Sequence, residues 1–303
     1  MTRPLATTLL LLTSMIWGFA FLAQKSAMDT MGPLTFAAMR YTIGGLAILP
    51  LAIWEYRRKR RPPVRTLPAA HWGLILATGT VFFLGSWLQQ AGLLTTTVTN
   101  GGFLTALYVL FVPLIALVAL RVWPHPVIWI GVPVALTGIY MLNGGIHGFN
   151  SGDGLVIGSA VFWALHVLLL GHTARVTGLP IFVSGISFLI AAAMAGIAMF
   201  ILESPTWTGI LAGWPQLAYT GLLSTAIAFT LQAIAQRHVP AANTAIIMSA
   251  ESLFAALGGA VLLGERLPAV GYLGAALIFA AIMMVEIVPV LRNRTLGTVA
   301  EKV

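Results

Sequence analysis

Apolar runs of about 20 residues follow one another along almost the whole chain, with short polar turns between them. A helix needs about 20 mostly apolar residues to cross the hydrocarbon core of a bilayer, where its backbone polar groups must be hydrogen-bonded within the segment. Charged residues make up 8% of the 303 residues, against about 25% in typical soluble domains. The pattern predicts an all-α integral membrane protein.

Ten transmembrane spans can be delimited, with breaks at turns that contain glycine or proline. They are residues 5–23, 33–53, 70–90, 99–120, 126–142, 154–172, 181–202, 215–236, 241–263 and 270–288. The first run ends in Gln24 and Lys25 without a small-residue cleavage site, which favours a retained helix over a signal peptide. The loops are short, so we expect no separate soluble domain.

Lysine and arginine residues are distributed unevenly between the two sides of these spans. Thirteen fall on one side, and only Lys25 and Arg266 on the other. The side rich in lysine and arginine is normally cytoplasmic, so both the N-terminus and the C-terminus are predicted to be cytoplasmic. The basic cluster at residues 57–65 is interpreted as a topology anchor rather than a site for nucleic acid, despite the net charge of +8.

The two halves of the chain resemble each other at a nearly constant offset along the sequence. The pairs that carry the resemblance are Gln89/Gln232, Asn100/Asn243 and, at a slightly larger offset, Trp17/Trp163. Five spans in each half is an odd number, so the second half would enter the membrane from the opposite side, as in many secondary transporters. We expect a first repeat over residues 1–145, a second over 151–291 and a cytoplasmic tail over 292–303.

Two motifs resemble a known family. Residues 17–21 read Trp-Gly-Phe-Ala-Phe, which is similar to the Trp-Gly signature of EamA-type proteins of the drug/metabolite transporter (DMT) superfamily. Residues 241–244, followed by Gly-Glu-Arg-Leu at 264–267, resemble the end of the EamA repeat. The resemblance covers nearly the whole chain and is greatest to YddG-type exporters of amino acids. It implies a basket-like bundle of ten helices, in two inverted five-helix EamA repeats around a central cavity, in the bacterial inner membrane.

Glu251 lies near the middle of the ninth predicted span, where an unpaired acid costs about 2.5 kcal/mol or more. It is a candidate for contact with a substrate ammonium group or a proton, and the alternative is a structural hydrogen bond or ion pair, with Arg40 as the obvious partner. For Arg40 we expect a position at the outer interface or in a structural pair, with contact to a substrate carboxylate as the alternative.

Aromatic and amide side chains supply the other candidates. Trp163 and His166 share one face of the sixth span, and an indole ring suits aromatic or ammonium ligands. Helix packing is the alternative for the aromatic residues and for His166, and helix bridging for the amides. The candidate substrate-binding residues are Trp17, Trp87, Gln89, Asn100, Tyr108, Trp163, His166, Gln232, Asn243 and Glu251.

Several classes of function lack their motifs. No lysine follows a glycine, as a nucleotide-binding P-loop requires, and no His-Glu-x-x-His sequence or cysteine is present to bind a metal. We expect no enzyme activity, no cofactor, no nucleotide and no nucleic acid; the partners would be a small-molecule substrate and the lipid bilayer.

The sequence thus predicts an inner-membrane secondary transporter that exports small metabolites, namely aromatic or neutral amino acids, by alternating access. The alternative is a multidrug exporter of lipophilic or quaternary cations. Glu251 leaves both proton coupling and facilitated diffusion open.

Overall fold

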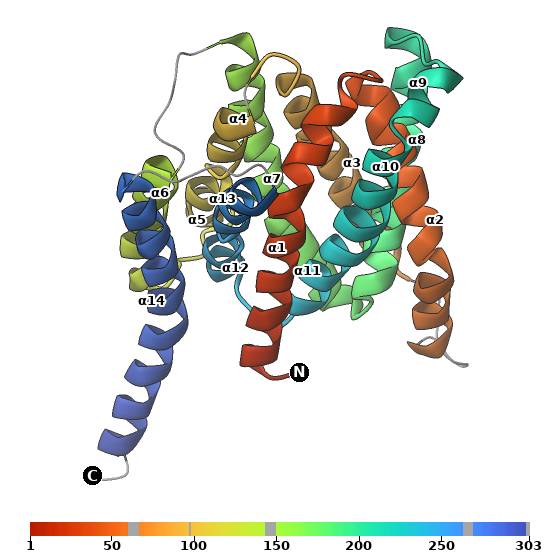
Figure 1. Cartoon of the computed structure of the whole chain (residues 1–303). Helices are drawn as coiled ribbons and strands as arrows, with labels where there is room; N and C mark the ends of the chain where they lie inside the picture. The colour runs from red at the N-terminus through yellow and green to blue at the C-terminus, as the bar shows by residue number, and fades with distance from the viewer. Residues whose placement is uncertain (60–66, 97, 143–149, 263–268, 301–303) are drawn as a thin grey trace.

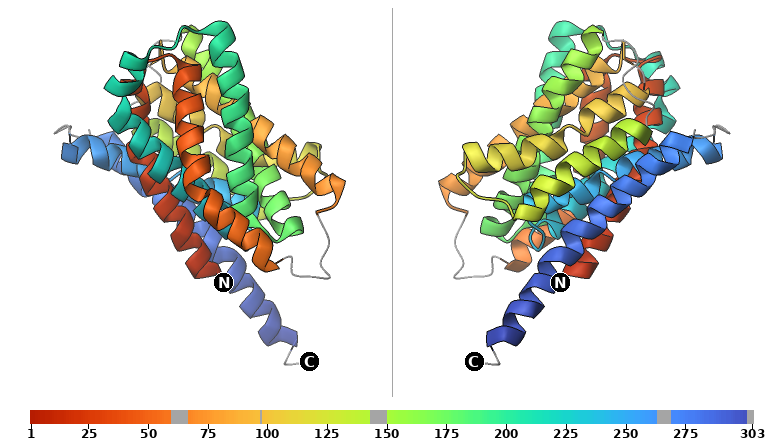
Figure 2. Two further views of the ribbon diagram at one scale, coloured as in Figure 1. Left: turned by 90° about the vertical axis from the view of Figure 1, so that its right-hand side faces the viewer. Right: turned by 90° about the vertical axis from the view of Figure 1, so that its left-hand side faces the viewer.

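The computed structural model describes residues 1–59, 67–96, 98–142, 150–262 and 269–300, which form a bundle of helices (Figure 1). The helices are α1 (Arg3–Ala27), α2 (Pro33–Lys59), α3 (Ala69–Gly92), α4 (Val98–Thr105), α5 (Tyr108–Val118), α6 (Pro126–Leu142), α7 (Ser151–Thr177), α8 (Pro180–Leu202), α9 (Trp207–Ala212), α10 (Trp214–Ala218), η1 (Tyr219–Phe229), α11 (Thr230–Ala235), α12 (Ala241–Met248), α13 (Glu251–Leu262) and α14 (Ala269–Ala300). The start of α1 and the end of α14 lie at the same end of the bundle (Figures 1 and 2).

Eight helical stretches of the described residues are long and apolar enough to cross a membrane. Two further apolar helices, Pro126–Leu142 and Ala241–Leu257, are shorter. The predicted helical membrane protein is confirmed, whereas the count of ten spanning helices stays a prediction. The Gly-Glu-Arg-Leu turn at residues 264–267 lies outside the described residues.

The fourth and ninth predicted spans are each broken into two helices, α4 with α5 and α12 with α13. The breaks fall at residues 106–107 and 249–250. At the first break the backbone tightens, because the Val109 N–H donates to the Ala106 carbonyl oxygen at 3.0 Å, three residues back. A helix that is interrupted inside a bundle frees backbone and side chains to line an internal site.

The eighth predicted span also departs from a regular α-helix. Its central part, η1, is a π-helix of 11 residues between α10 and α11. Long π-helices are rare, and short π-helical turns often occur at functional sites because they re-aim the side chains of one face. Here the π-helix carries Ser224 and Phe229 into the middle of the bundle.

Helices α2 and α8 run antiparallel, and a carboxylate from the end of α8 binds the start of α2. The Glu203 carboxylate, just after α8, accepts hydrogen bonds from the backbone N–H groups of Leu34 and Thr35 in the first turn of α2, both at 2.8 Å. The Thr35 hydroxyl donates to the same carboxylate at 2.7 Å. These N–H groups have no partner within their own helix, and the helix dipole favours a negative charge there.

The other end of the same helix pair carries the reverse contact. Glu55, near the end of α2, accepts hydrogen bonds from the backbone N–H groups of Ile181 and Phe182 at the start of α8, at 3.0 and 2.9 Å. Each helix therefore caps the other. The α2–α8 pair is joined at both ends and is expected to behave as one rigid unit.

We expect Glu203→Ala to lower the unfolding temperature of the purified protein in detergent by several degrees, since losing such a cap costs about 1–2 kcal/mol. Asp29→Asn is the matched control, because Asp29 is an exposed acid between α1 and α2. It should leave the unfolding temperature unchanged. Equal unfolding temperatures for the two variants would contradict the capping role.

Candidate functional site

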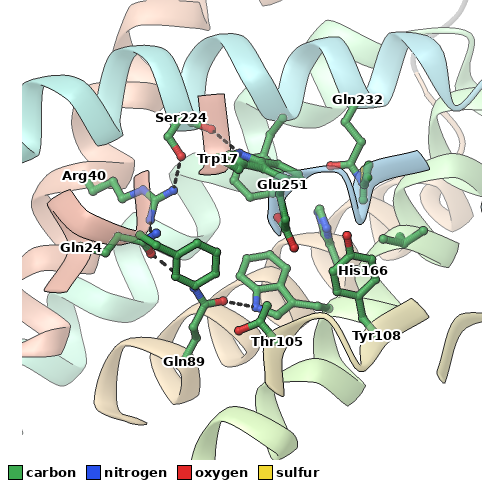
Figure 3. Close-up of a pocket in the computed structure, with 15 residues that line it drawn as sticks. Trp17, Gln24, Arg40, Gln89, Thr105, Tyr108, His166, Ser224, Gln232 and Glu251 are labelled. Atoms are coloured by element: carbon green, nitrogen blue, oxygen red, sulfur yellow. Dashed lines mark hydrogen bonds between the residues drawn. The ribbon is translucent and has the colours of Figure 1, made fainter. Parts of the chain in front are cut away.

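A cavity lies among α1, α2, α3, α7, the η1–α11 segment and the two helix breaks (Figure 3). Its lining residues are Trp17, Phe21, Gln24, Arg40, Gln89, Thr105, Tyr108, Trp163, His166, Val167, Ser224, Phe229, Gln232, Met248 and Glu251. In Figure 3 the polar side chains form two groups, one around Arg40 and one that extends from the Glu251 carboxylate, near the middle of the view, toward Gln232. We name them the Arg40 end, with Gln24, Arg40, Gln89 and Ser224, and the Glu251 end, with Thr105, Tyr108, His166, Gln232 and Glu251.

Helical spacing explains why these side chains meet. Trp17, Phe21 and Gln24 follow one another at helical spacing, so they share one face of α1. Trp163 and His166 share a face of α7 in the same way. At both helix breaks, the residues that close the first helix and open the second line the cavity.

Arg40 is 4% exposed and is held by neutral oxygen atoms. Its Nε donates to the Thr225 hydroxyl at 2.9 Å, and its two terminal nitrogens donate to Gln24 Oε1 at 3.1 Å and to the Ser224 hydroxyl at 2.9 Å. No carboxylate of the described residues lies within ion-pair distance of the guanidinium. The ion pair between Arg40 and Glu251, which was the alternative interpretation for Glu251, is therefore not formed among the described residues.

Two indole N–H groups complete the polar part of the Arg40 end. Trp163 Nε1 donates to Gln89 Oε1 at 2.6 Å, and Gln89 Nε2 makes a long contact of 3.5 Å with Gln24 Oε1. Trp17 Nε1 donates to the backbone carbonyl oxygen of Ser224 in the π-helix at 3.1 Å. Hydrogen bonds thus join α1, α2, α3, α7 and η1 around this end.

Aromatic rings wall the middle of the cavity. The Phe229 ring lies between the two indoles, with its centroid 4.5 Å from that of Trp17 and 5.8 Å from that of Trp163, on which it stacks. The Phe82 ring packs behind them, 5.0 Å from the His166 ring. Such faces attract apolar groups and cations alike.

The polar side chains of the Arg40 end have hydrogen-bond partners, whereas several polar atoms of the Glu251 end have none in the described structure. Glu251 is 4% exposed. The Tyr108 hydroxyl lies beside the Glu251 carboxylate, and the buried side-chain atoms of this end without a hydrogen-bond partner among the described residues include Thr105 Oγ1, His166 Nδ1, both polar atoms of the Gln232 amide and Glu251 Oε1. Buried polar groups in proteins are normally paired, so such a cluster indicates space for a polar ligand or water.

Seven of the ten residues predicted to bind substrate line this cavity; they are Trp17, Gln89, Tyr108, Trp163, His166, Gln232 and Glu251. The other three lie elsewhere. Trp87 stacks on Phe83 at 6.0 Å, and Asn243 bridges to the Val285 carbonyl oxygen in α14 at 3.0 Å. Asn100 is buried in α4 and is not part of the lining. Aromatic packing was the default interpretation for the helix face of Trp87, and helix bridging was the alternative interpretation for Asn243.

Eight lining residues were not among the ten candidates, namely Phe21, Gln24, Arg40, Thr105, Val167, Ser224, Phe229 and Met248, and contact of Arg40 with a substrate was only an alternative interpretation. Following the helix face of Trp17 by one and two turns would have found Phe21 and Gln24. Ser224 had no such signal, because the π-helix that presents it is not visible in the hydropathy pattern. No cluster of three or more histidine, aspartate, glutamate or cysteine side chains that could hold a metal ion occurs in the described parts of the chain.

Gly18 sets the distance between α1 and the ninth span. A Cβ atom built on Gly18 would lie 2.6 Å from the Glu251 carbonyl oxygen and 2.7 Å from the Ala255 backbone nitrogen. Both contacts are with backbone, which cannot move aside as a side-chain end can. The small residue after Trp17 therefore brings the indole and the start of α13 to the same cavity.

We expect Gly18→Ala to destabilise the protein by about 1–3 kcal/mol, because the added methyl group pushes α13 away from α1. Gly196→Ala in α8 is the control, since a Cβ atom there meets nothing within 4 Å. Thermal unfolding in detergent measures both. An unchanged unfolding temperature for Gly18→Ala would show that α13 can shift without cost.

Comparison with known proteins bears on this bundle as a whole. Residues 5–144 and 150–287 each match the EamA-like transporter family. An "Uncharacterized transporter" of Archaeoglobus fulgidus is 33% identical over 283 residues, covering 92% of this chain and 84% of that protein. The "Threonine/homoserine exporter RhtA" of Salmonella typhimurium is 28% identical over 286 residues, with coverages of 91% and 88%.

Two further proteins agree with these matches. The "Uncharacterized inner membrane transporter YedA" of Escherichia coli is 27% identical over 287 residues and covers 90% of this chain. That match takes in 87% of YedA. A solved crystal structure shares the fold with a TM-score of 0.77 at 19% identity, over 95% of this chain and 98% of that one. The predicted resemblance is confirmed: the chain is a multi-pass membrane transporter that belongs to the EamA-like family of the DMT superfamily.

Proposed function

We propose that the protein is a secondary transporter that exports small amino acids across a bacterial inner membrane, and that it holds the substrate ammonium group at Glu251. The observation that carries this proposal is a buried carboxylate with an unpartnered oxygen, which faces a cavity bordered by aromatic rings. A carboxylate with no counter-charge in a membrane bundle is costly, and a bound ammonium group would compensate it.

The unpartnered groups around Glu251 suit an ammonium ligand. An ammonium group donates three hydrogen bonds. Glu251 Oε1 and Gln232 Oε1 are acceptors at this end without a hydrogen-bond partner within the described structure, and the Tyr108 hydroxyl lies beside the Glu251 carboxylate. The indole rings of Trp17 and Trp163 add faces that attract a cation.

The size of the cavity favours a small substrate. The cavity has a volume of about 50 Å³, and one water molecule needs about 10–15 Å³. The space therefore holds a few water molecules or a compact ligand without rearrangement. RhtA, which is named as an exporter of threonine and homoserine, is a relative with substrates of this size.

The positions of the helix breaks and of the capping carboxylates along the chain fit an inverted repeat with alternating access. The two helix breaks, at residues 106–107 and 249–250, are equivalent positions in the alignment of the halves that pairs Gln89 with Gln232. The two capping carboxylates likewise join equivalent ends of α2 and α8. Two family matches, over residues 5–144 and 150–287, support repeats at 1–145 and 151–291. Cytoplasmic termini and a tail at 292–303 follow from the lysine and arginine distribution.

Glu251 also provides a means of coupling substrate export to proton entry. One carboxylate cannot hold an ammonium group and a proton at the same time, so the two would compete for it. Export of one substrate would then be linked to entry of one proton, whereas a transporter without this competition would be a facilitator. A pH gradient distinguishes the two modes.

We expect Glu251→Gln to reduce uptake of a labelled amino acid into proteoliposomes about 10- to 100-fold, because a charge-assisted hydrogen bond contributes about 1.5–3 kcal/mol. Response to an imposed pH gradient should be lost as well. A panel of the twenty common amino acids identifies the substrate. Glu286→Gln is the control, since that carboxylate pairs with Arg3 outside the cavity. Full uptake by Glu251→Gln would remove Glu251 from the proposal.

The alternative, an exporter of lipophilic or quaternary cations, is favoured by the same indole rings beside a carboxylate. We expect tetraethylammonium to compete weakly with the amino acid, because it cannot donate hydrogen bonds to Glu251. Uptake of the labelled amino acid at rising tetraethylammonium concentration measures this. Uptake of labelled tetraethylammonium, with no uptake of any amino acid above that of empty vesicles, would favour the cation exporter.

A further inference from the structure

We propose that Arg40, Gln24 and Gln89 form a subsite for the carboxylate group of the substrate, at the Arg40 end of the cavity (Figure 3). The inference rests on the proposed function and deepens it. It assigns the substrate as a zwitterion held by both of its charged groups, rather than as an amine of any kind.

The charge of Arg40 is the first argument. A guanidinium carries five N–H donors, and three donate to Thr225, Gln24 and Ser224. These partners are neutral, so they solvate the charge without cancelling it. With the side chain 4% exposed and no carboxylate of the described residues beside it, two N–H groups and one positive charge stay available to an anion.

The second argument is the orientation of the oxygen and nitrogen atoms in the neighbouring amides, Gln89 and Gln24. An indole nitrogen can only donate, so Gln89 must turn its oxygen to Trp163 and keep its nitrogen as a donor. A guanidinium can also only donate, so the Gln24 oxygen must face Arg40. The orientations of both amides are thus fixed by their partners and do not depend on telling oxygen from nitrogen in the side chain.

These orientations make the Arg40 end an environment of donors. Both amide oxygens accept hydrogen bonds from protein donors, so the amide nitrogens face the rest of this end as donors. A third amide, Gln90, likewise donates its nitrogen to the Gln24 backbone oxygen at 2.9 Å. A carboxylate accepts hydrogen bonds and carries the negative charge that would balance Arg40, so it is the group that this end recognises.

The two ends of the cavity then select for a dipolar ligand. A simple amine would occupy Glu251 and leave the Arg40 charge uncompensated. A simple carboxylate would do the reverse. An α-amino acid satisfies both ends at once, and its side chain would lie against the aromatic rings of Trp17, Trp163 and Phe229.

The experiment compares two ligands and three forms of the protein by calorimetry in detergent. The ligands are the amino acid that wild type binds most tightly in the panel of twenty and the methyl ester of that amino acid, which keeps the ammonium group but lacks the negative charge. We expect the ester to bind wild type at least about tenfold more weakly, as expected when charge-assisted hydrogen bonds are lost.

Gln89→Glu is the informative variant, because one carboxylate oxygen still accepts the Trp163 N–H. The other oxygen replaces Nε2, 3.5 Å from the Gln24 oxygen that Arg40 binds, and so brings a negative charge to the Arg40 end. Arg40 itself is a poorer choice, since its hydrogen bonds tie α2 to α1 and η1. We expect Gln89→Glu to bind the amino acid at least about tenfold more weakly and to lose the preference for the amino acid over the ester that wild type shows. Retained binding of the ester shows that the variant is folded.

Gln232→Glu is the matched control, because Gln232 is the counterpart of Gln89 in the second half of the chain and puts the same charge at the Glu251 end. Whatever its absolute affinity, it should keep the preference for the amino acid over the ester. If the ester binds wild type as tightly as the amino acid, or if Gln89→Glu keeps the preference, the carboxylate subsite is overturned and the ammonium site stands. If wild type binds no amino acid, the proposed function fails, and the subsite fails with it.

Discussion

A buried guanidinium that no carboxylate of the described residues neutralises is the constraint around which the interior of this bundle is arranged. In a membrane protein such a charge is costly unless hydrogen bonds surround it. Arg40 obtains them from Gln24 in α1 and from Ser224 and Thr225 in η1. The charge therefore ties together helices from the first and second halves of the chain, and it fixes the positions of the amides and indoles that border the cavity.

The rest of the frame allows those helices to approach closely. Gly18 lets α1 touch the backbone of α13, and the π-helix turns Ser224 toward Arg40 and Trp17. Outside the cavity, Glu55 and Glu203 join α2 and α8 at both ends. Strong hydrogen bonds are thus concentrated at the ends of the helix pair and at the Arg40 end, and the Glu251 end is left with unpaired groups. A site that must bind and release a ligand needs such an incomplete part within a rigid surround.

Much of this architecture could be predicted from the sequence. Long apolar runs identified the membrane class, because hydrocarbon tolerates only segments that satisfy their own backbone. The Trp-Gly motif and the resemblance between the halves indicated the EamA-type family. Tryptophan, glutamine and glutamate residues inside apolar spans stood out as costly or specific, and seven of the ten residues chosen for that reason line one cavity.

The remaining part depended on which helix faces which. Helical periodicity gives the face on which Asn243 or Trp87 lies, but not the neighbour of that face; Asn243 turned out to bridge to α14, and Trp87 to stack within α3. The sequence placed Arg40 at the membrane interface or in an ion pair, since a lone charge in a span is costly and neutral partners from distant helices leave no trace in the chain. The sequence by itself thus determined the environment, the family and the unusual residues. Only the tertiary structure decided that donors gather at one end of the cavity and an unpaired acid lies at the other, because that depends on contacts between segments from opposite halves of the chain, such as the hydrogen bond from Arg40 to Ser224.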